Sequence, residues 1–316
     1  MPLPARRWRH RWRHRWRHPP PPYARDMPTC DLGSVTIYFE QAGTGERLLL
    51  ISGTGGDLRN PPRVFDTPLG SHFEILAYDQ RGLGQTSIPE GPYTMAEYGD
   101  DAAALLAARG WDSCLVVGIS FGGMVAQELA IRHPERVRRL VLACTSSGGA
   151  GGASIPFDEL ATLEGEARVQ RQIEMMDTRW DAARRSERAA EYKVMVEAMS
   201  GHLRLGQQSP EAARGAALQL EARRHHDTWD RLATIVCPTL VCGGRYDGIA
   251  PPQNSANLAS QIPGAELALF DGGHGFLWQD SAAFPRILGF LEADAANGTA
   301  TATASTTTTN ASQVSQ

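Results

Sequence analysis

The pentapeptide Gly118-Ile119-Ser120-Phe121-Gly122 lies between a short apolar run at residues 113–117 and an amphipathic stretch at 123–132. The run predicts a buried strand, and the stretch predicts a helix. A G-x-S-x-G motif between a strand and a helix is typical of a nucleophile elbow, a tight turn that strains the serine backbone and exposes its hydroxyl. The flanking glycines lack the Cβ atoms that would clash in such a turn. The sequence therefore favours Ser120 as a nucleophile over an incidental serine in a glycine-rich turn.

Apolar runs and helical stretches alternate on both sides of this motif. We expect further strands at residues 35–40, 47–51, 73–78, 137–143, 237–242 and 266–270, and helices at 94–109 and 282–292. The run at 35–40 alternates between apolar and polar residues, as an edge strand does. Near-continuous apolar strands separated by helices are typical of a parallel sheet that is covered on both faces. The sequence therefore predicts an α/β fold with a mostly parallel, twisted sheet flanked by helices.

The alternation is interrupted once. Residues 157–229 have helical spacing of their apolar residues and no strand candidate. An insertion at this point is expected to lie over the carboxyl ends of the strands, where open α/β sheets bind ligands. We therefore expect five segments: an extension at 1–28, a first part of the core at 29–146, a helical cap at 147–231, a second part of the core at 232–294 and a tail at 295–316.

A serine nucleophile needs a base, and the base needs a carboxylate that orients it. Of nine histidines, His274 follows the last expected strand directly and has glycines on both sides. Asp247 follows the strand at 237–242, and it gives the chain order Ser, Asp, His. Asp271 is a rival because it is close to His274 in sequence, but it lies in the same turn, which it would more naturally cap. We therefore expect a triad of Ser120, His274 and Asp247.

The oxygen of a tetrahedral intermediate also needs hydrogen-bond donors. One donor is expected from the residue after the nucleophile, which is Phe121. The other is expected from the loop after an early strand, which here is Gly53-Thr54-Gly55-Gly56. The backbone N–H groups of Phe121 and Thr54 are therefore the predicted oxyanion hole.

The composition limits the classes of partner and cofactor. No apolar run approaches the roughly 20 residues that cross a membrane, so stable membrane insertion is not expected. The five cysteines show no C-x-x-C spacing, and four of them fall in or beside expected core strands. This usage favours reduced packing residues in the cytoplasm, with no metal site.

Residues 1–26 differ in composition from the rest of the chain. They contain eight arginines and a repeated Trp-Arg-His-Arg pattern that ends in four prolines. A basic arm for nucleic acid or anionic lipid is one interpretation. We prefer a disordered extension, with Met27 as an alternative start, because the repeat is too short to bury a core. The rest of the chain has a net charge of −11, which argues against nucleic acid as a partner. The Thr- and Ala-rich residues 295–316 predict a disordered tail.

Several motifs together resemble those of the α/β-hydrolase superfamily over about residues 32–291. They are Gly118-Ile119-Ser120-Phe121-Gly122-Gly123-Met124-Val125-Ala126-Gln127, His133-Pro134-Glu135-Arg136-Val137, Tyr78-Asp79-Gln80-Arg81-Gly82, Cys237-Pro238-Thr239-Leu240 and Gly273-His274. With Ser52-Gly53-Thr54-Gly55-Gly56-Asp57-Leu58-Arg59, the chain is most similar to 3-oxoadipate enol-lactonase-like esterases and lactonases. Many superfamily members have His-Gly where this chain has Ser52-Gly53, which leaves the substrate open.

The resemblance implies a serine hydrolase of the α/β-hydrolase fold. Such an enzyme would cleave small carboxylic esters or lactones through the triad and an acyl-enzyme intermediate, without a metal or organic cofactor. Two alternatives stay open. The first is a C–C bond hydrolase of ring-cleavage diketones, which uses the same triad, and the second is a non-catalytic, ligand-binding member of the fold. The oligomeric state is not predicted.

Overall fold

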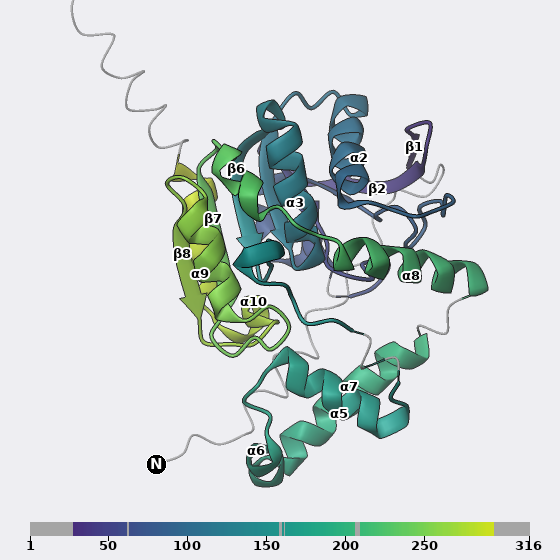
Figure 1. Ribbon diagram of the computed structural model, residues 1–316, viewed down its shortest axis with the longest axis vertical. Coiled ribbons are helices and arrows are strands. Elements are labelled where there is room, and N and C mark those ends of the chain that lie inside the picture. Colours follow the sequence, from purple (N-terminus) through teal and green to yellow (C-terminus); the bar gives the residue numbers. More distant parts are fainter. Residues whose placement is uncertain (1–27, 62, 158–159, 161, 206–208, 294–316) are drawn as a thin grey trace, which may run out of the picture.

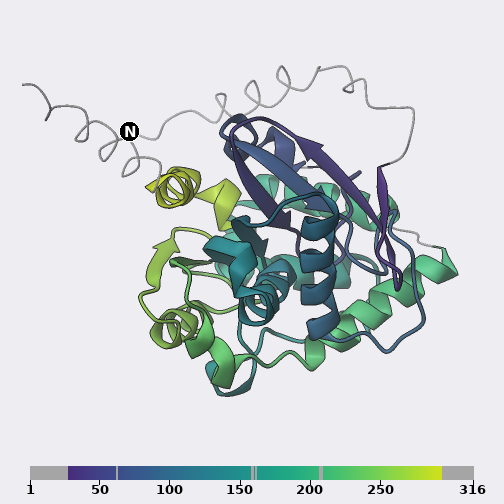
Figure 2. The ribbon, with the colours of Figure 1, turned by 90° about the horizontal axis from the view of Figure 1, so that it is seen from above.

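A single eight-stranded sheet crosses the middle of the protein, with helices on both of its sides (Figures 1 and 2). The computed structural model describes residues 28–61, 63–157, 160, 162–205 and 209–293. The strands are β1 (Thr29–Asp31), β2 (Thr36–Ala42), β3 (Glu46–Ile51), β4 (Phe73–Tyr78), β5 (Cys114–Ile119), β6 (Val137–Ala143), β7 (Thr239–Gly244) and β8 (Glu266–Phe270). The predictions for residues 1–27 and 295–316 lie outside the described residues.

The strand order is β1-β2-β4-β3-β5-β6-β7-β8. Strands β3 to β8 run parallel to one another, whereas β2 pairs antiparallel with both β4 and β1. The prediction of a mostly parallel sheet is confirmed. The prediction that residues 35–40 form an edge strand is wrong, because β1 pairs with the outer side of β2. Strand β1 has only three residues, too few to show an alternating pattern.

Helices cover both faces of the sheet, and the central strands are buried on both. On one face, β3 and β5 contribute Leu49 and Val116 to a core with the helices α2 and α3. On the other face, their neighbours Leu50 and Val117 pack with α10 and α11. The core helices are α2 (Met95–Ala108), α3 (Phe121–Arg132), α9 (Pro252–Gln261), α10 (Phe276–Gln279) and α11 (Ala283–Leu291). Burial on both faces explains why these strands are continuous apolar runs.

The helix α2 shows how local sequence sets an element's ends. The Thr94 hydroxyl accepts a hydrogen bond from the Glu97 backbone N–H, and the Glu97 carboxylate accepts one from the Thr94 backbone N–H. This reciprocal capping box satisfies donors that the first turn leaves open. Gly110, with φ of 65°, follows the last turn in the left-handed region that glycine tolerates.

Among the described residues, four α-helices lie between β6 and β7, in the stretch predicted to be a cap. They are α5 (Gly165–Met176), α6 (Ala182–Glu187), α7 (Ala189–Leu205) and α8 (Pro210–Arg224). Figure 1 shows α5, α6 and α7 gathered below the sheet, while α8 runs beside the core. Helix α7 packs on α5 and α6. The boundaries of the five predicted segments stay predictions.

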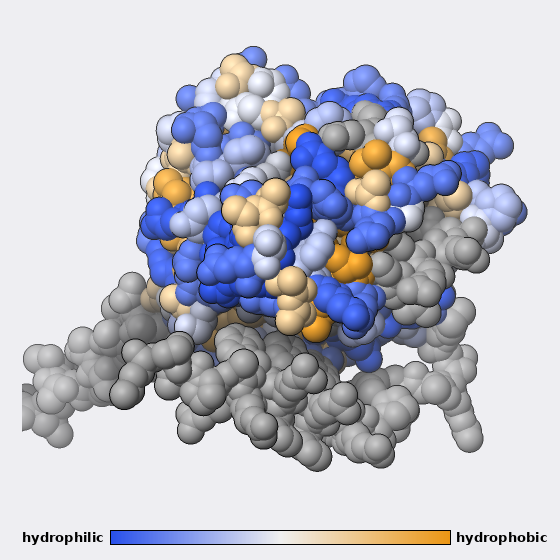
Figure 3. Space-filling model, turned by 90° about the horizontal axis from the view of Figure 1, so that it is seen from below, coloured by the Kyte–Doolittle hydropathy of each residue, from blue (hydrophilic) through white to orange (hydrophobic). Residues whose placement is uncertain are grey.

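Short 3-10 helices complete the structure. Two of them, η1 (Val64–Asp66) and η2 (Pro68–Ser71), stand between β3 and β4, and the others are η3 (Pro134–Arg136), η4 (Gly149–Gly151) and η5 (Trp229–Thr234). The surface seen from below is largely hydrophilic, with small and separate apolar areas among its coloured atoms (Figure 3). In the described part of the chain, no helix combines the length and apolar character that a membrane crossing requires.

Candidate active site

Ser120 stands in the turn between β5 and α3, with φ of 56° and ψ of −117°. Its backbone N–H donates to the Ala143 carbonyl at 2.8 Å, which ties the turn to β6. A Cβ atom at Gly122 would lie 2.1 Å from the Ile51 carbonyl oxygen, and one at Gly118 would lie 2.4 Å from the Gly122 carbonyl oxygen. Contacts this short leave no room for a side chain at either position unless the backbone shifts. The motif therefore contains its glycines because strand, turn and helix approach one another closely.

The histidine and the carboxylate expected from the sequence lie next to this serine. The Nε2 atom of His274 is 3.0 Å from the Ser120 Oγ, and its Nδ1 atom is 2.8 Å from the Asp247 Oδ2. His274 lies in the loop between β8 and α10, and Asp247 lies in the loop after β7. The carboxyl ends of three parallel strands thus bring together side chains that are up to 154 residues apart.

The Asp247 side chain is completely buried. Its Oδ1 accepts hydrogen bonds from the backbone N–H groups of Ile249 at 2.8 Å and Ala250 at 2.9 Å. Because a carboxylate only accepts hydrogen bonds, the proton shared with His274 belongs to Nδ1. The Nε2 atom of a neutral imidazole is then free to accept the proton of the serine hydroxyl. This arrangement orients the histidine toward Ser120.

Asp271, the rival carboxylate, is at the surface. Its side chain is 72% exposed and pairs with the Arg179 guanidinium at 3.1 Å. Its backbone N–H donates to the Asp280 carboxylate at 2.8 Å, so the turn is capped by Asp280 instead. The geometry thus separates the two aspartates: one contacts the imidazole, and the other is exposed and contacts an arginine.

The end of α5, in the stretch predicted to be a cap, supports both loops that carry these side chains. The backbone N–H of His274 donates to the Met176 carbonyl at 2.6 Å, and that of Gly248 donates to the Met175 carbonyl at 3.1 Å. Just beyond them, the buried carboxylate of Asp177 accepts hydrogen bonds from Arg179 and from Gln279 of α10. The last residues of α5 and Asp177 after them therefore support both loops.

The two predicted oxyanion donors belong to segments that flank Ser120. Phe121 is the first residue of α3, and an α-helix has no acceptor of its own for that N–H. Thr54 follows Gly53, where a Cβ atom would lie 3.4 Å from the Ser120 Cβ. The β3 loop therefore passes directly beside the serine.

Side chains from the turn after β4 hold this loop in place. The Gln80 amide donates to the Ser52 carbonyl at 2.8 Å, and the Asp79 Oδ1 accepts from the Leu58 N–H at 2.7 Å. Burial raises the pKa of Asp79 to about 6, although its hydrogen bonds from the backbone oppose that shift. The Tyr78–Gly82 motif thus stabilises the loop rather than contacting the triad.

Sequence reasoning missed Gln219, a buried residue of α8. Its Oε1 accepts a hydrogen bond from the backbone N–H of Gly55 at 2.9 Å. The two residues are 164 positions apart, and nothing in the spacing of α8 marks this glutamine. Helix α8 therefore contacts the predicted oxyanion loop directly.

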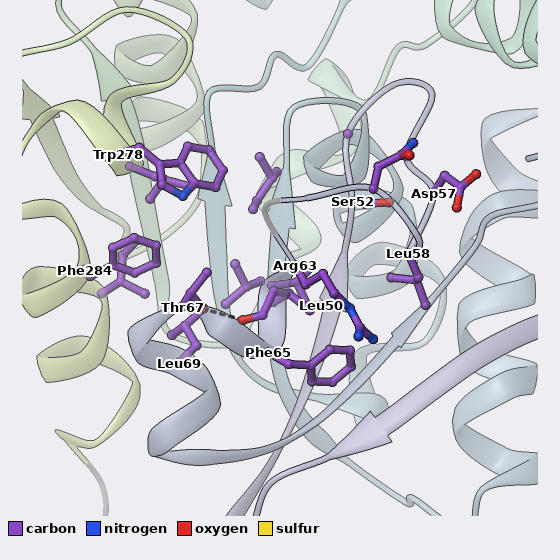
Figure 4. A pocket seen from close by; sticks show the side chains of 18 of the residues that line it. Leu50, Ser52, Asp57, Leu58, Arg63, Phe65, Thr67, Leu69, Trp278 and Phe284 are labelled. Atoms are coloured by element: carbon purple, nitrogen blue, oxygen red, sulfur yellow. Dashed lines mark hydrogen bonds between the residues drawn. The ribbon is translucent and has the colours of Figure 1, made fainter. Parts of the chain in front are cut away.

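Two cavities lie near the site. The larger, of about 250 Å³, is lined mainly by apolar side chains of β3, β5, η1, η2, α10 and α11 (Figure 4). The smaller, of about 190 Å³, lies between α3, the segment after β6 and the end of α8. It is lined in part by the buried His226, whose Nε2 is 3.2 Å from the Ser146 carbonyl oxygen. Within the described ranges, no cluster of three or more His, Cys, Asp or Glu side chains is arranged for a metal ion.

The model of the alpha/beta hydrolase fold family matches residues 46–281. The chain belongs to this family. That match covers β3 to α10 and includes Ser120, Asp247 and His274. The eight-stranded, mostly parallel sheet flanked by helices is the fold that the sequence motifs predicted, and this prediction is confirmed.

Three relatives illustrate the chemistry found among similar proteins. A carbamate hydrolase RutD from Serratia proteamaculans is 30% identical, with 80% of this chain and 94% of the relative covered. The 2-hydroxymuconate semialdehyde hydrolase of Pseudomonas sp. is 32% identical, with 83% and 93% covered. The 3-oxoadipate enol-lactonase 2 of Acinetobacter baylyi is 28% identical, with 75% and 91% covered. The predicted similarity to enol-lactonases is confirmed, and the names of all three relatives support hydrolase chemistry.

Proposed function

We propose that this protein is a serine hydrolase that cleaves small carboxylic esters or lactones. One observation carries the proposal: the Ser120 hydroxyl, the His274 imidazole and the buried Asp247 carboxylate form a continuous chain of hydrogen bonds of 3.0 and 2.8 Å. A serine within hydrogen-bond reach of a base that a third group orients has the arrangement of an activated nucleophile.

In the proposed acylation step, the Ser120 Oγ attacks the ester carbonyl carbon while its proton passes to His274 Nε2. The C=O electron pair moves to the oxygen, which becomes an oxyanion. Asp247 stabilises the imidazolium that forms. The intermediate then collapses, the C–O bond to the leaving group breaks, and His274 returns the proton to the departing alkoxide.

The oxyanion is assigned to the backbone N–H groups of Phe121 and Thr54. The support is that Phe121 opens α3 and that the Thr54 loop passes beside the serine. Loss of one such donor typically costs roughly 10²–10³ in rate. In deacylation, His274 takes a proton from water as the water oxygen attacks the acyl carbon. The bond to the Ser120 Oγ then breaks, His274 returns the proton to that oxygen, and the carboxylic acid leaves.

Labelling with a fluorophosphonate tests the proposal without knowledge of the substrate. We expect one adduct per chain by intact mass in the wild-type protein and none in Ser120→Ala. An adduct would be followed by a screen of esters, lactones and carbamates. A folded wild-type protein that gives no adduct would overturn the proposal and favour the non-catalytic, ligand-binding alternative.

A second candidate is a C–C bond hydrolase of ring-cleavage diketones. It is favoured by the 32% identity to a 2-hydroxymuconate semialdehyde hydrolase over most of both chains. Turnover of a vinylogous diketone by a protein that leaves simple esters intact would establish this candidate over the first.

The proposed partner is a small molecule in a reducing compartment, the cytoplasm. All five cysteines are free, and four of them are buried. Burial raises the pKa of the Cys114 and Cys242 thiols to about 12, which keeps both in the unreactive protonated form. These thiols therefore act as packing residues.

A further inference from the structure

The larger cavity lies beside the turn of the nucleophile, on the sheet face opposite α2 and α3. Its wall includes Ile119, the residue before Ser120, and Gly53, which lies against the Ser120 side chain. Neither Ser120 nor His274 lines it, so it is a side chamber of the site rather than the site itself. Among the described residues between β3 and β4, the short 3-10 helices η1 and η2 contribute to the wall of the chamber.

The walls of the chamber are apolar. Figure 4 shows Trp278 and Phe284 on one side and Leu58 and Phe65 on the other, around an open space. Leu69, at the base, is buried. The free energy falls when a hydrocarbon chain replaces water against apolar walls of this kind. A cavity of about 150 Å³ accepts a six-carbon benzene ring, so one of about 250 Å³ accepts a chain of roughly eight carbons.

The charged groups at the rim are balanced by neighbours. The Arg63 guanidinium donates to the Glu40 carboxylate and stacks 5.7 Å from the Phe65 ring. The Asp57 carboxylate accepts two hydrogen bonds from the Arg59 guanidinium, the shorter at 2.6 Å. The Arg63 Nε has no partner, but the positive charge of that side chain is already matched. The rim therefore favours a neutral chain over one that ends in a carboxylate.

The position of the chamber also distinguishes the two ends of an ester. A leaving oxygen must lie near His274 Nε2 to receive its proton. The chamber instead opens beside the loop of Ser52, Gly53, Gly55 and Gly56, on the side of the proposed oxyanion. Of the substituents on the attacked carbon, the acyl chain is the one left to pass beside Gly53.

We propose that this chamber is the acyl pocket of the enzyme and that it selects neutral, unbranched acyl chains of about eight carbons. The inference rests on the proposed function of Ser120. Burial of one methylene contributes a factor of about four in binding. We therefore expect kcat/KM for p-nitrophenyl esters to rise roughly two- to four-fold per added methylene up to octanoyl. Octyl acetate, in which the chain is on the alcohol, should show no such gain over ethyl acetate.

Val64→Phe fills part of the chamber from η1, and its matched control is Val236→Phe at a position that is 79% exposed. We expect Val64→Phe to lower the octanoyl-to-butyryl ratio of kcat/KM at least about ten-fold, whereas Val236→Phe leaves the ratio unchanged. Trp278→Ala, at a half-exposed rim position, provides a second variant that tolerates substitution, and it should lower the same ratio about three-fold. An unchanged ratio in both chamber variants would overturn the proposal, as would a preference for adipoyl monoesters over hexanoyl esters.

Binding of octanoate to Ser120→Ala, measured by calorimetry, separates this proposal from the proposed function. Binding that Val64→Phe weakens about ten-fold supports the chamber even if the wild-type protein gives no fluorophosphonate adduct. An adduct at Ser120 together with octanoate binding that is absent, or indifferent to Val64→Phe, would leave the hydrolase standing and overturn the acyl pocket.

Discussion

At the scale of single residues, burial distinguishes two aspartates that could orient His274, one that contacts it and one that is close to it in sequence. Asp247 is enclosed, contacts Nδ1 and receives two backbone N–H groups, whereas Asp271 faces solvent and an arginine. An enclosed carboxylate can hold one tautomer of the imidazole, because no water competes for its hydrogen bonds. An exposed ion pair contributes little. The same substitution at the two positions should therefore have very different effects.

We expect Asp247→Asn to lower kcat by about 10⁴-fold, because an amide can donate to Nδ1 and favour the tautomer whose proton faces Ser120. Asp271→Asn, the matched control, should retain near wild-type kcat because its ion pair is exposed. Steady-state hydrolysis of the best ester found in the screen measures both. Loss of activity in Asp271→Asn, with Asp247→Asn still active, would identify Asp271 as the acid that orients His274.

His226 leads to a prediction about how the stability of the protein depends on pH. Burial lowers its pKa from 6.5 to about 4, so the folded protein keeps this imidazole neutral where the unfolded chain protonates it. The unfolded state therefore binds more protons between these pH values. The contribution of His226 to stability is complete above pH 6.5 and is lost as the pH falls toward 4.

We expect this residue to cost the protein about 3 kcal/mol of unfolding free energy between pH 6.5 and 4. His226→Gln, whose amide keeps a donor toward the Ser146 carbonyl, should show a smaller loss over that range. His225→Gln, at an exposed neighbouring position, should follow the wild-type curve. Urea unfolding at several pH values measures all three, and parallel curves for wild type and His226→Gln would contradict the assignment.

At the scale of elements, the elbow depends on how closely α3 approaches β3. The two meet at Gly122, where the Ile51 carbonyl occupies the place of a side chain. A helix usually gains from alanine in place of glycine. Here the added methyl group must push the two elements apart, so the packing cost should exceed the gain in helix propensity.

Gly122→Ala should therefore destabilise the protein by about 1–3 kcal/mol, the usual cost of overpacking. Gly289→Ala in α11 is the matched control, since a Cβ atom there meets nothing within 4 Å. That variant should be neutral or more stable by up to about 1 kcal/mol. Thermal and urea unfolding compare the two. Equal stability of both variants would show that α3 can shift without cost.

At the scale of the whole molecule, sequence periodicity predicted the strands because burial on both faces makes them apolar throughout. The chain order of Ser120, Asp247 and His274 predicted which side chains the structure brings together. Helix α9 was missed because most of its residues are polar, and two of the residues that it buries, Asn254 and Ser255, are polar as well. The chamber could not be predicted, since its wall combines residues from β3, β5, η1, η2, α10 and α11 that are far apart in the sequence. The contact of Gln219 with Gly55 also depends on how the cap meets the core.

That last contact gives a prediction about the molecule as a unit. Gln219 of α8 is 1% exposed, and its carbonyl oxygen is the acceptor for the Gly55 N–H in the predicted oxyanion loop. Without this acceptor, the backbone N–H of the exposed Gly55 loses the hydrogen bond that joins its loop to α8, and the loop is free to move. A loop that moves to find another partner changes the direction of the Thr54 N–H. We therefore expect Gln219 to act as a positioning residue for the proposed oxyanion hole.

Gln219→Leu should lower kcat by about ten-fold with little change in KM, because a displaced oxyanion donor affects the transition state more than the bound substrate. Gln219→Glu keeps an oxygen acceptor at the same place and should retain most of the wild-type kcat. Steady-state kinetics of both variants, with urea unfolding as a check on folding, tests the coupling of cap and core. If Gln219→Leu raised KM at unchanged kcat, the residue would instead contribute to substrate binding. The hydrogen bond between Gln219 and Gly55 would then have no role in the chemical step.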